Sequence, residues 1–217
     1  MGIKKKEPPR AANVTRRKQR ERNRPKSKSI IMFLGREVKE YEEKRLNIIK
    51  LSISKGELLC EKCLRPLAIH SSYPRGIKET GETIRVTIVW CNRCRIWHAV
   101  LPDFLLRNKH YSGNEVESVI IDGETTPIDQ IDTKASASTI RRWLKQICGR
   151  IVRAVGKLKY HFGREGRSVN EVKIDAGFCY SELEQVLEMA PHGVKYSGNK
   201  LGLANIWLRT CGVAVYI

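Results

Sequence analysis

Cys60-Glu-Lys-Cys63 and Cys91-Asn-Arg-Cys94 form two Cys-x-x-Cys pairs, with 27 residues between Cys63 and Cys91. Within each pair the two cysteines lie three positions apart, so one tight turn can aim both sulfurs at a single ion. Two such turns supply four thiolates, which is the closed tetrahedral ligand set of a structural zinc site. The pairs therefore predict one metal-binding unit that spans residues 60–94.

The chain around the second pair has the pattern of β-strands. Residues 84–90 alternate with a period of two and run directly into Cys91, and residues 96–101 predict a further strand that Pro102 ends. The Tyr73-Pro-Arg-Gly76 segment and Gly81 predict turns before the first of these strands. Together these features predict a zinc ribbon, in which two metal-binding turns sit on a small antiparallel sheet.

Other uses of the four cysteines fit the sequence less well. Two disulfides need an oxidising compartment, and no signal segment directs the chain to one. Iron shares this sulfur geometry and stays an alternative to zinc. A catalytic zinc is disfavoured because four thiolates leave no open position for water or substrate. His70 and His98 flank the pairs and are interpreted as outer-shell or surface histidines rather than ligands.

The totals point to a polyanionic partner. The 217 residues contain 41 Lys and Arg against 23 Asp and Glu, a formal net charge of +18, and 41% of them are hydrophobic. No apolar run is long enough for a membrane span, so we expect no membrane contact. Cys148, Cys179 and Cys211 remain outside the pairs and are expected to be buried free thiols in a reducing, cytoplasmic and nucleoid-associated setting.

Residues 1–29 are expected to form a disordered basic arm. They hold twelve Lys or Arg, two acids, three prolines and no aromatic residue, so they cannot bury enough surface to offset the entropy of ordering. Such arms bind phosphates without reading sequence, and a solubilising tail is the alternative. The arm residues chosen as nucleic-acid contacts are Arg16, Arg17, Lys18 and Arg20.

The remaining pattern predicts an α+β protein, with a small zinc-ribbon sheet followed by a helix-turn-helix and a C-terminal helical region. Residues 30–108 hold a strand at 30–34, a helix at 37–50 and the four-cysteine ribbon. Residues 109–160 hold a helix that opens at Ser112, a short helix from Pro127 and a long basic helix. Residues 161–217 form a small helical unit with helices near 181–189 and 199–209, whose role the sequence does not indicate.

The long basic helix is the candidate DNA-recognition element. Nine Lys or Arg and no acid lie between Lys134 and Arg164. Arg141 and Arg142 fall in the first turn, where the helix dipole disfavours positive charge, and DNA phosphates would reverse that penalty. A solvated basic face is the alternative. The residues placed to contact duplex DNA are Ser136, Ser138, Thr139, Arg141, Arg142 and Lys145.

Several of these segments resemble a group of bacterial proteins that combine a zinc ribbon with a helix-turn-helix. The group is catalogued mainly as a domain of unknown function and is often associated with insertion sequences and transposons. The resemblance covers about residues 30–160, and the chain differs from the pattern at Arg107-Asn108, where the group has Pro-Tyr. The matching segments are Ile30-Ile-Met-Phe33, both cysteine pairs, His70-Ser-Ser-Tyr73-Pro-Arg75, His98-Ala-Val-Leu-Pro-Asp-Phe-Leu105, Tyr111-Ser112 and Ser136-Ala-Ser-Thr-Ile-Arg-Arg-Trp143. The resemblance implies DNA binding near transposition, with a transposase or other mobile-element protein as a further partner, and no catalytic residue.

Three functions follow from these observations. The leading one is a non-enzymatic, zinc-containing protein that recognises duplex DNA. A homodimer is one form that this protein could take. The second is an RNA- or ribosome-associated zinc-ribbon protein, for which Trp90 and Trp97 are the candidate stacking residues. The third is a nuclease or transposase subunit. Its metal site would need some of Asp103, Asp122, Asp129, Asp132 and Asp175, which belong to no recognisable motif.

Overall fold

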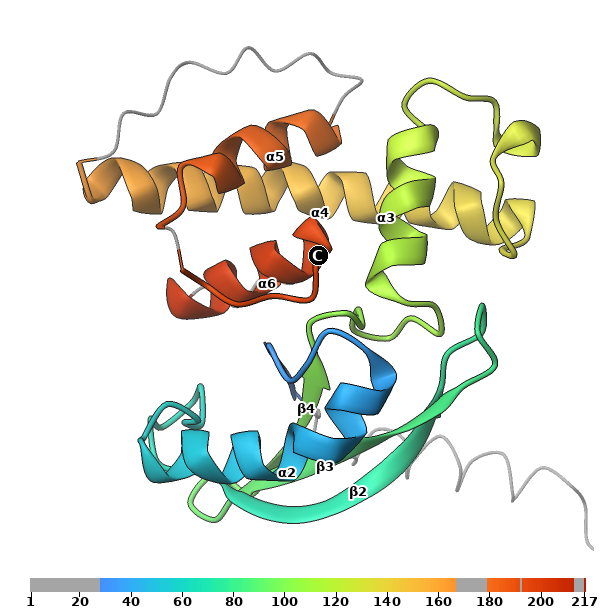
Figure 1. Cartoon of the computed structure of the whole chain (residues 1–217). Helices are drawn as coiled ribbons and strands as arrows, with labels where there is room; N and C mark the ends of the chain where they lie inside the picture. The colour runs from blue at the N-terminus through green and yellow to red at the C-terminus, as the bar shows by residue number, and fades with distance from the viewer. Residues whose placement is uncertain (1–27, 167–178, 192, 213–216) are drawn as a thin grey trace, which may run out of the picture.

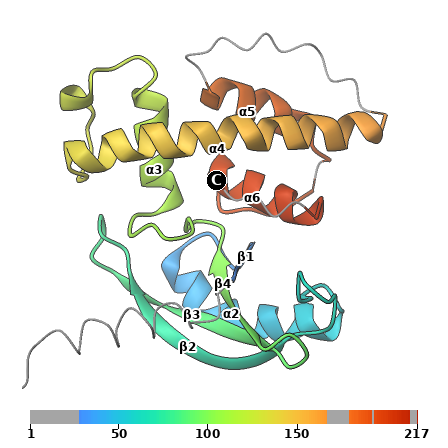
Figure 2. The same ribbon diagram turned by 180° about the vertical axis from the view of Figure 1, so that it is seen from behind.

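The computed structural model describes residues 28–166, 179–191, 193–212 and 217. These residues form the expected α+β fold, with a four-stranded mixed sheet and five α-helices (Figure 1). The sheet and α2 make one half of the molecule, and α3 to α6 make the other, as the view from behind also shows (Figure 2). The arm contacts predicted at Arg16, Arg17, Lys18 and Arg20 lie outside the described residues.

The strands around the cysteine pairs are antiparallel as predicted, but a parallel strand joins them, so the complete sheet is mixed. Its strands are β1 (Lys28–Met32), β2 (Ala68–Gly76), β3 (Thr83–Cys91) and β4 (Ile96–Pro102), in the order β1-β4-β3-β2. The β2–β3 and β3–β4 pairs are antiparallel, but β1 pairs with β4 in parallel, with Ile30 opposite Val100. Helix α2 (Val38–Ser54) follows β1, and the long connection that contains it lets β1 and β4 run in the same direction.

The segment Tyr73-Pro-Arg-Gly76, predicted as a turn, is the second half of β2. Pro74 lacks an N–H and would weaken a central strand, but β2 lies at the edge of the sheet and pairs only with β3. The real turn comes later, where Gly81 takes a φ of 75° and its N–H bonds to the carbonyl of Ile77 at 2.9 Å. The proline and glycine that predicted a turn therefore belong to an edge strand.

Helix α2 closes the core of the sheet half. Tyr41 and Ile49 are fully buried, and the Tyr41 ring meets Phe104 edge-on at 5.8 Å. The Tyr41 hydroxyl donates a hydrogen bond to the carbonyl of Arg85 in β3 at 2.7 Å. The helix is thus held to the sheet by apolar packing and by a hydrogen bond that satisfies the buried phenol.

The helical half contains α3 (Gly113–Asp122), a 3-10 turn (Ile128–Gln130), α4 (Ala137–Arg164), α5 (Cys179–Glu188) and α6 (Lys200–Thr210). Ser112 caps α3 as predicted, because its hydroxyl accepts the N–H of Glu115 at 3.1 Å. The short helix expected after Pro127 is a single 3-10 turn. Helix α4 runs 28 residues, past Leu158, because Phe162 continues its buried stripe.

One hydrophobic cluster joins α3, α4, α5 and α6. Along α4, Ile147, Ile151 and Leu158 are fully buried, and Trp143 is buried against the ring of Tyr111 at 4.9 Å. Cys148, Cys179 and Cys211 are half-buried, so the expectation that these thiols are buried is only partly met. In the part of the chain that the structure describes, every helix is too short or too polar to cross a membrane.

Asp103 connects the two halves of the molecule. It follows β4, is fully buried, and accepts the N–H of Ser197 at 2.6 Å, while its second carboxylate oxygen has no hydrogen-bond partner among the described residues. Its carbonyl accepts the Asn199 side chain at 3.3 Å, and a Cβ on Gly202 would lie 2.3 Å from that oxygen. Glycine is therefore required where α6 approaches the end of β4.

Burial raises the pKa of Asp103 from 3.8 to about 6, although the Ser197 N–H acts in the opposite direction. The folded state thus prefers the protonated acid. Protonated Asp103 contributes fully to the free energy of unfolding below about pH 3.8, and this contribution is lost as the pH rises through about 6.

We expect Asp103→Asn to remove this pH dependence. Asparagine keeps an oxygen that accepts the Ser197 N–H and carries no charge to desolvate. Between about pH 7.5 and about pH 5.5, the free energy of unfolding of the wild type should rise by about 1 kcal/mol relative to the variant. Denaturant unfolding of both proteins at the two pH values measures this difference, and a difference that does not change with pH would contradict the assignment.

Candidate metal centre and nucleic-acid interface

The first cysteine pair lies on a turn between α2 and β2. The N–H of Leu64 donates a hydrogen bond to the carbonyl of Cys60 at 2.8 Å, and the N–H of Cys60 donates one to the carbonyl of Arg65 at 2.9 Å. Leu64 takes a φ of 55°, which reverses the chain immediately after Cys63. An isolated bridge between Leu59 and Pro66 closes the base of the turn.

The second pair repeats this geometry between β3 and β4. The N–H of Arg95 bonds to the carbonyl of Cys91 at 2.8 Å, and Arg95 takes a φ of 51°. Cys91 is the last residue of β3 and pairs with Ile96, the first residue of β4. In both turns a residue other than glycine occupies the left-handed region directly after the second cysteine, at a cost of roughly 1–2 kcal/mol. A metal ion held by both turns would offset that cost.

The four sulfurs converge on one point. Each lies within 4.8 Å of the others, and the Sγ atoms of Cys63 and Cys91 are 3.5 Å apart. A tetrahedral zinc with Zn–S bonds of about 2.3 Å places its sulfurs about 3.8 Å apart, so this cluster is close to the required size. Cys60 and Cys91 are buried and Cys63 and Cys94 are half-buried. The arrangement can hold one metal ion with four thiolates and leaves no protein position for a substrate.

Backbone amides point at the sulfurs. The N–H of Cys94 bonds to the Cys91 sulfur at 3.4 Å, and the backbone N–H groups of Lys62 and Cys63 act to lower the pKa of Cys60. The N–H of Arg65 lowers the pKa of Cys63 to about 7, whereas burial raises the pKa of Cys60. N–H donors stabilise thiolates, which are the form of cysteine that binds metal.

The neighbouring histidines are not part of the cluster. His70 is exposed and its ring lies edge-on to Trp97 at 4.2 Å, whereas His98 is buried in β4. Among the described residues, the four cysteines form the only group of three or more His, Cys, Asp or Glu side chains close enough to share a metal. Asp175, one of the acids considered for a nuclease site, lies outside the described residues, and Asp103 is committed to the junction with α6.

The predicted DNA contacts gather at the N-terminal end of α4. Arg141, Arg142 and Lys145 are exposed, no described carboxylate pairs with them, and the first turn of the helix contains no acid. The hydroxyl of Ser136 hydrogen-bonds Ser138 at 3.1 Å and Thr139 at 3.0 Å, and it does not cap the helix. This end of α4 therefore offers hydroxyls and cations to an anion, with Thr139 half-buried and the other five residues exposed.

Tertiary packing adds two cations that the site prediction omitted. Lys109, in the loop before α3, is half-buried near Arg142 and Arg150. Burial and then the charges of Arg150 and Arg142 lower the pKa of Lys109. Like charges this close repel one another, and a bound phosphate would relieve the repulsion. No local motif in the sequence could have identified Lys109, because its neighbours lie more than thirty positions away in the chain.

A family model described as a domain of unknown function, DUF6431, matches residues 60–143. Comparisons with curated proteins and with solved structures give no match. The matched region begins at Cys60 and ends at Trp143, so it holds both cysteine pairs, α3 and the first two turns of α4, but less than half of the chain. The four cysteines, Arg141 and Arg142 thus lie inside the matched region, whereas Lys145 and Arg150 lie beyond its end.

Proposed function

We propose that this chain is a DNA-binding protein in which a structural zinc ion, held by Cys60, Cys63, Cys91 and Cys94, braces the sheet. The first turns of α4 contact duplex DNA in the manner of a recognition helix, and the basic segment 1–29 adds phosphate contacts. The observation that supports this most strongly is a group of exposed cations, Arg141, Arg142 and Lys145, at an acid-free helix start, with no ion-pair partner among the described residues. The resemblance to proteins of mobile elements supports a role near transposition.

The chemistry of each side chain decides whether it is assigned to DNA bases or to phosphates. Arginine can bond two guanine atoms at once, so Arg141 and Arg142 are assigned to base edges in the major groove. Ser136, Ser138 and Lys145 are assigned to phosphates, together with Lys109 and Arg150. The metal centre takes no part in the contact itself, because all four of its positions are filled by cysteines.

Selection from a pool of random duplexes tests this proposal. The full chain, purified with its metal, is incubated at about 150 mM salt with competitor RNA, and bound duplexes are separated by gel shift and sequenced. We expect a recovered consensus, and a palindromic consensus would indicate a dimer through its half-site spacing. Binding without any consensus would contradict sequence recognition.

An RNA-binding role is the second candidate, and one feature of the sheet favours it. Trp90 and Trp97 face each other across β3 and β4, with ring centres 4.2 Å apart, and both are partly exposed. Aromatic side chains on adjacent strands are the usual platform for unstacked RNA bases. In the same selection, displacement of the duplexes by competitor RNA would favour this role.

A further inference from the structure

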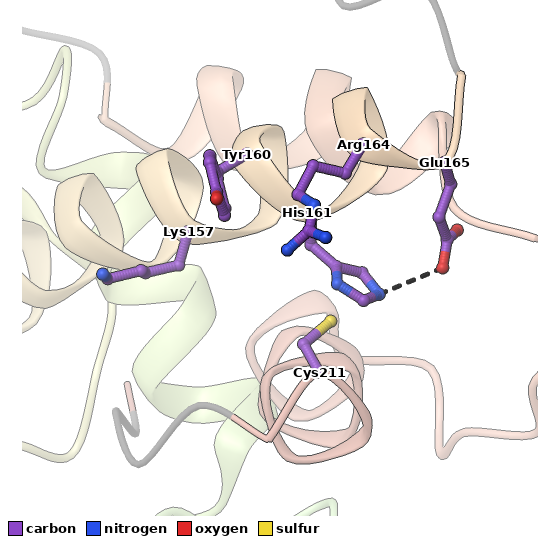
Figure 3. Close-up of a pocket in the computed structure, with 6 residues that line it drawn as sticks. All are labelled: Lys157, Tyr160, His161, Arg164, Glu165 and Cys211. Atoms are coloured by element: carbon purple, nitrogen blue, oxygen red, sulfur yellow. Dashed lines mark ion pairs between the residues drawn. The ribbon is translucent and has the colours of Figure 1, made fainter.

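A pocket of about 480 Å³ lies at the opposite end of α4 from the proposed DNA contacts. Its lining comes from the last two turns of α4 and from Cys211 at the end of α6 (Figure 3). At this size it can hold a group as large as a nucleotide. It is separate from the first turn of the helix, because Arg142 and Tyr160 are eighteen residues apart, which is about 27 Å along an α-helix.

The pocket is cationic. Lys157 and Arg164 are basic, and the one acid among the described lining residues, Glu165, lies 3.2 Å from the ring of His161. The pair of His161 and Glu165 is drawn as a dashed line in Figure 3, away from Lys157. Glu165 thus pairs with His161, and Lys157 has no ion-pair partner among the described residues. An anionic group would be attracted to this pocket.

Tyr160 is the unusual residue of this pocket. Tyr160 is 67% exposed, compared with 38% for Tyr73, the other exposed tyrosine among the described residues. Burial of such a ring is ordinarily favourable. Tyr160 lies three positions after Lys157 and four before Arg164, so all three residues share one face of α4. The guanidinium of Arg164 lies 5.9 Å from the centre of the Tyr160 ring.

We propose that this pocket binds a nucleotide of single-stranded nucleic acid, with the base stacked on Tyr160 and the flanking phosphates on Lys157 and Arg164. An aromatic ring flanked by cations on one exposed face is the arrangement that sequence-tolerant single-strand binding uses. A site for phosphate alone would need the cations but would gain nothing from an exposed ring. This proposal does not rest on the proposed duplex contacts, which use other residues at the far end of the helix.

The test compares two oligonucleotides that differ only in their bases. Fluorescence anisotropy with the full chain measures the affinity for a twelve-nucleotide oligothymidylate and for an abasic oligonucleotide of the same length. The basic segment 1–29 binds phosphates, so it contributes about equally to both affinities and cancels in their ratio. We expect the wild type to bind the oligothymidylate roughly 10-fold more tightly than the abasic strand.

Variants assign the preference to the pocket. Tyr160→Leu should bring the ratio close to one, whereas Tyr160→Phe and the control Tyr73→Leu, which alters a partly exposed tyrosine of β2, should preserve it. Exchange of Lys157 and Arg164 for glutamine should weaken binding of both strands by similar factors. A wild-type ratio of one, or a ratio unchanged in Tyr160→Leu, would overturn the proposal. The second result would assign base stacking to another surface, such as Trp90 and Trp97.

Discussion

Cys91→Ser is expected to abolish metal binding at the four-cysteine cluster and to unfold the adjoining end of the sheet. Cys91 is buried and belongs both to β3 and to the turn that carries the second cysteine pair. Serine has nearly the same shape, but its hydroxyl does not ionise near neutral pH and cannot replace a thiolate ligand. Three remaining thiolates would hold the ion far less tightly than four.

The loss of stability should be several kcal/mol. In small zinc-binding units, the free energy of metal binding, about 10–16 kcal/mol, is coupled directly to folding. Here the cost is expected to be smaller, because the sheet has its own core around Tyr41, Ile84 and Val89. Elemental analysis of the purified protein should find one zinc per wild-type chain and almost none in the variant, and thermal unfolding should show a lower Tm.

A matched control separates the metal site from cysteine loss in general. Cys211→Ser removes a half-buried thiol that lies outside the cluster, and it should retain full metal content. A chelator should lower the Tm of the wild type and of Cys211→Ser, but should leave Cys91→Ser unchanged. Stoichiometric metal in Cys91→Ser would remove this residue from the ligand set, and iron in the wild type would replace zinc in the proposal.

The sequence predicted the parts of the fold that depend on short spacings. The cysteine turns follow from residues three positions apart, β3 follows from a period-two pattern that runs into Cys91, and β4 follows from the strand-like run that Pro102 ends. The parallel pairing of β1 with β4 could not be predicted, because periodicity identifies a strand but not its partner. The segment around Pro74 was predicted as a turn for a related reason, since a proline is acceptable only on an edge strand and edge position is a property of the assembled sheet.

The candidate sites divide in the same way. The four cysteines were identified from spacing, and the described structure brings them together. Arg141 and Arg142 were predicted because they place positive charge in the first turn of a helix, which is again a local signal. Lys109 and the pocket at Tyr160 depend on tertiary packing. Lys109 lies in the loop before α3, and folding brings it close to Arg142 and Arg150 of α4. The pocket forms because the end of α6 lies beside the end of α4.

Replacement of both Arg141 and Arg142 by alanine is expected to cause the second large effect, the loss of discrimination between DNA sequences. Each arginine that bonds a guanine through two atoms contributes about 1–3 kcal/mol of preference over a wrong base. The double variant should therefore bind the selected consensus about 30-fold or more weakly, while its affinity for random duplexes changes much less. Both side chains are exposed and unpaired within the described chain, so the fold should not change.

The salt dependence of the double variant distinguishes base contacts from phosphate contacts. An arginine that bonds only a phosphate contributes about 0.9 to the slope of log affinity against log salt, and its loss weakens binding to every sequence equally. Lys39→Ala combined with Lys50→Ala is the charge-matched control, because it removes two exposed cations from α2 in the sheet half of the molecule. If Arg141 and Arg142 read bases, the double variant loses its sequence preference and the control keeps it. If the two double variants weaken all duplexes alike, the arginines act only through charge, and recognition must come from another part of the chain.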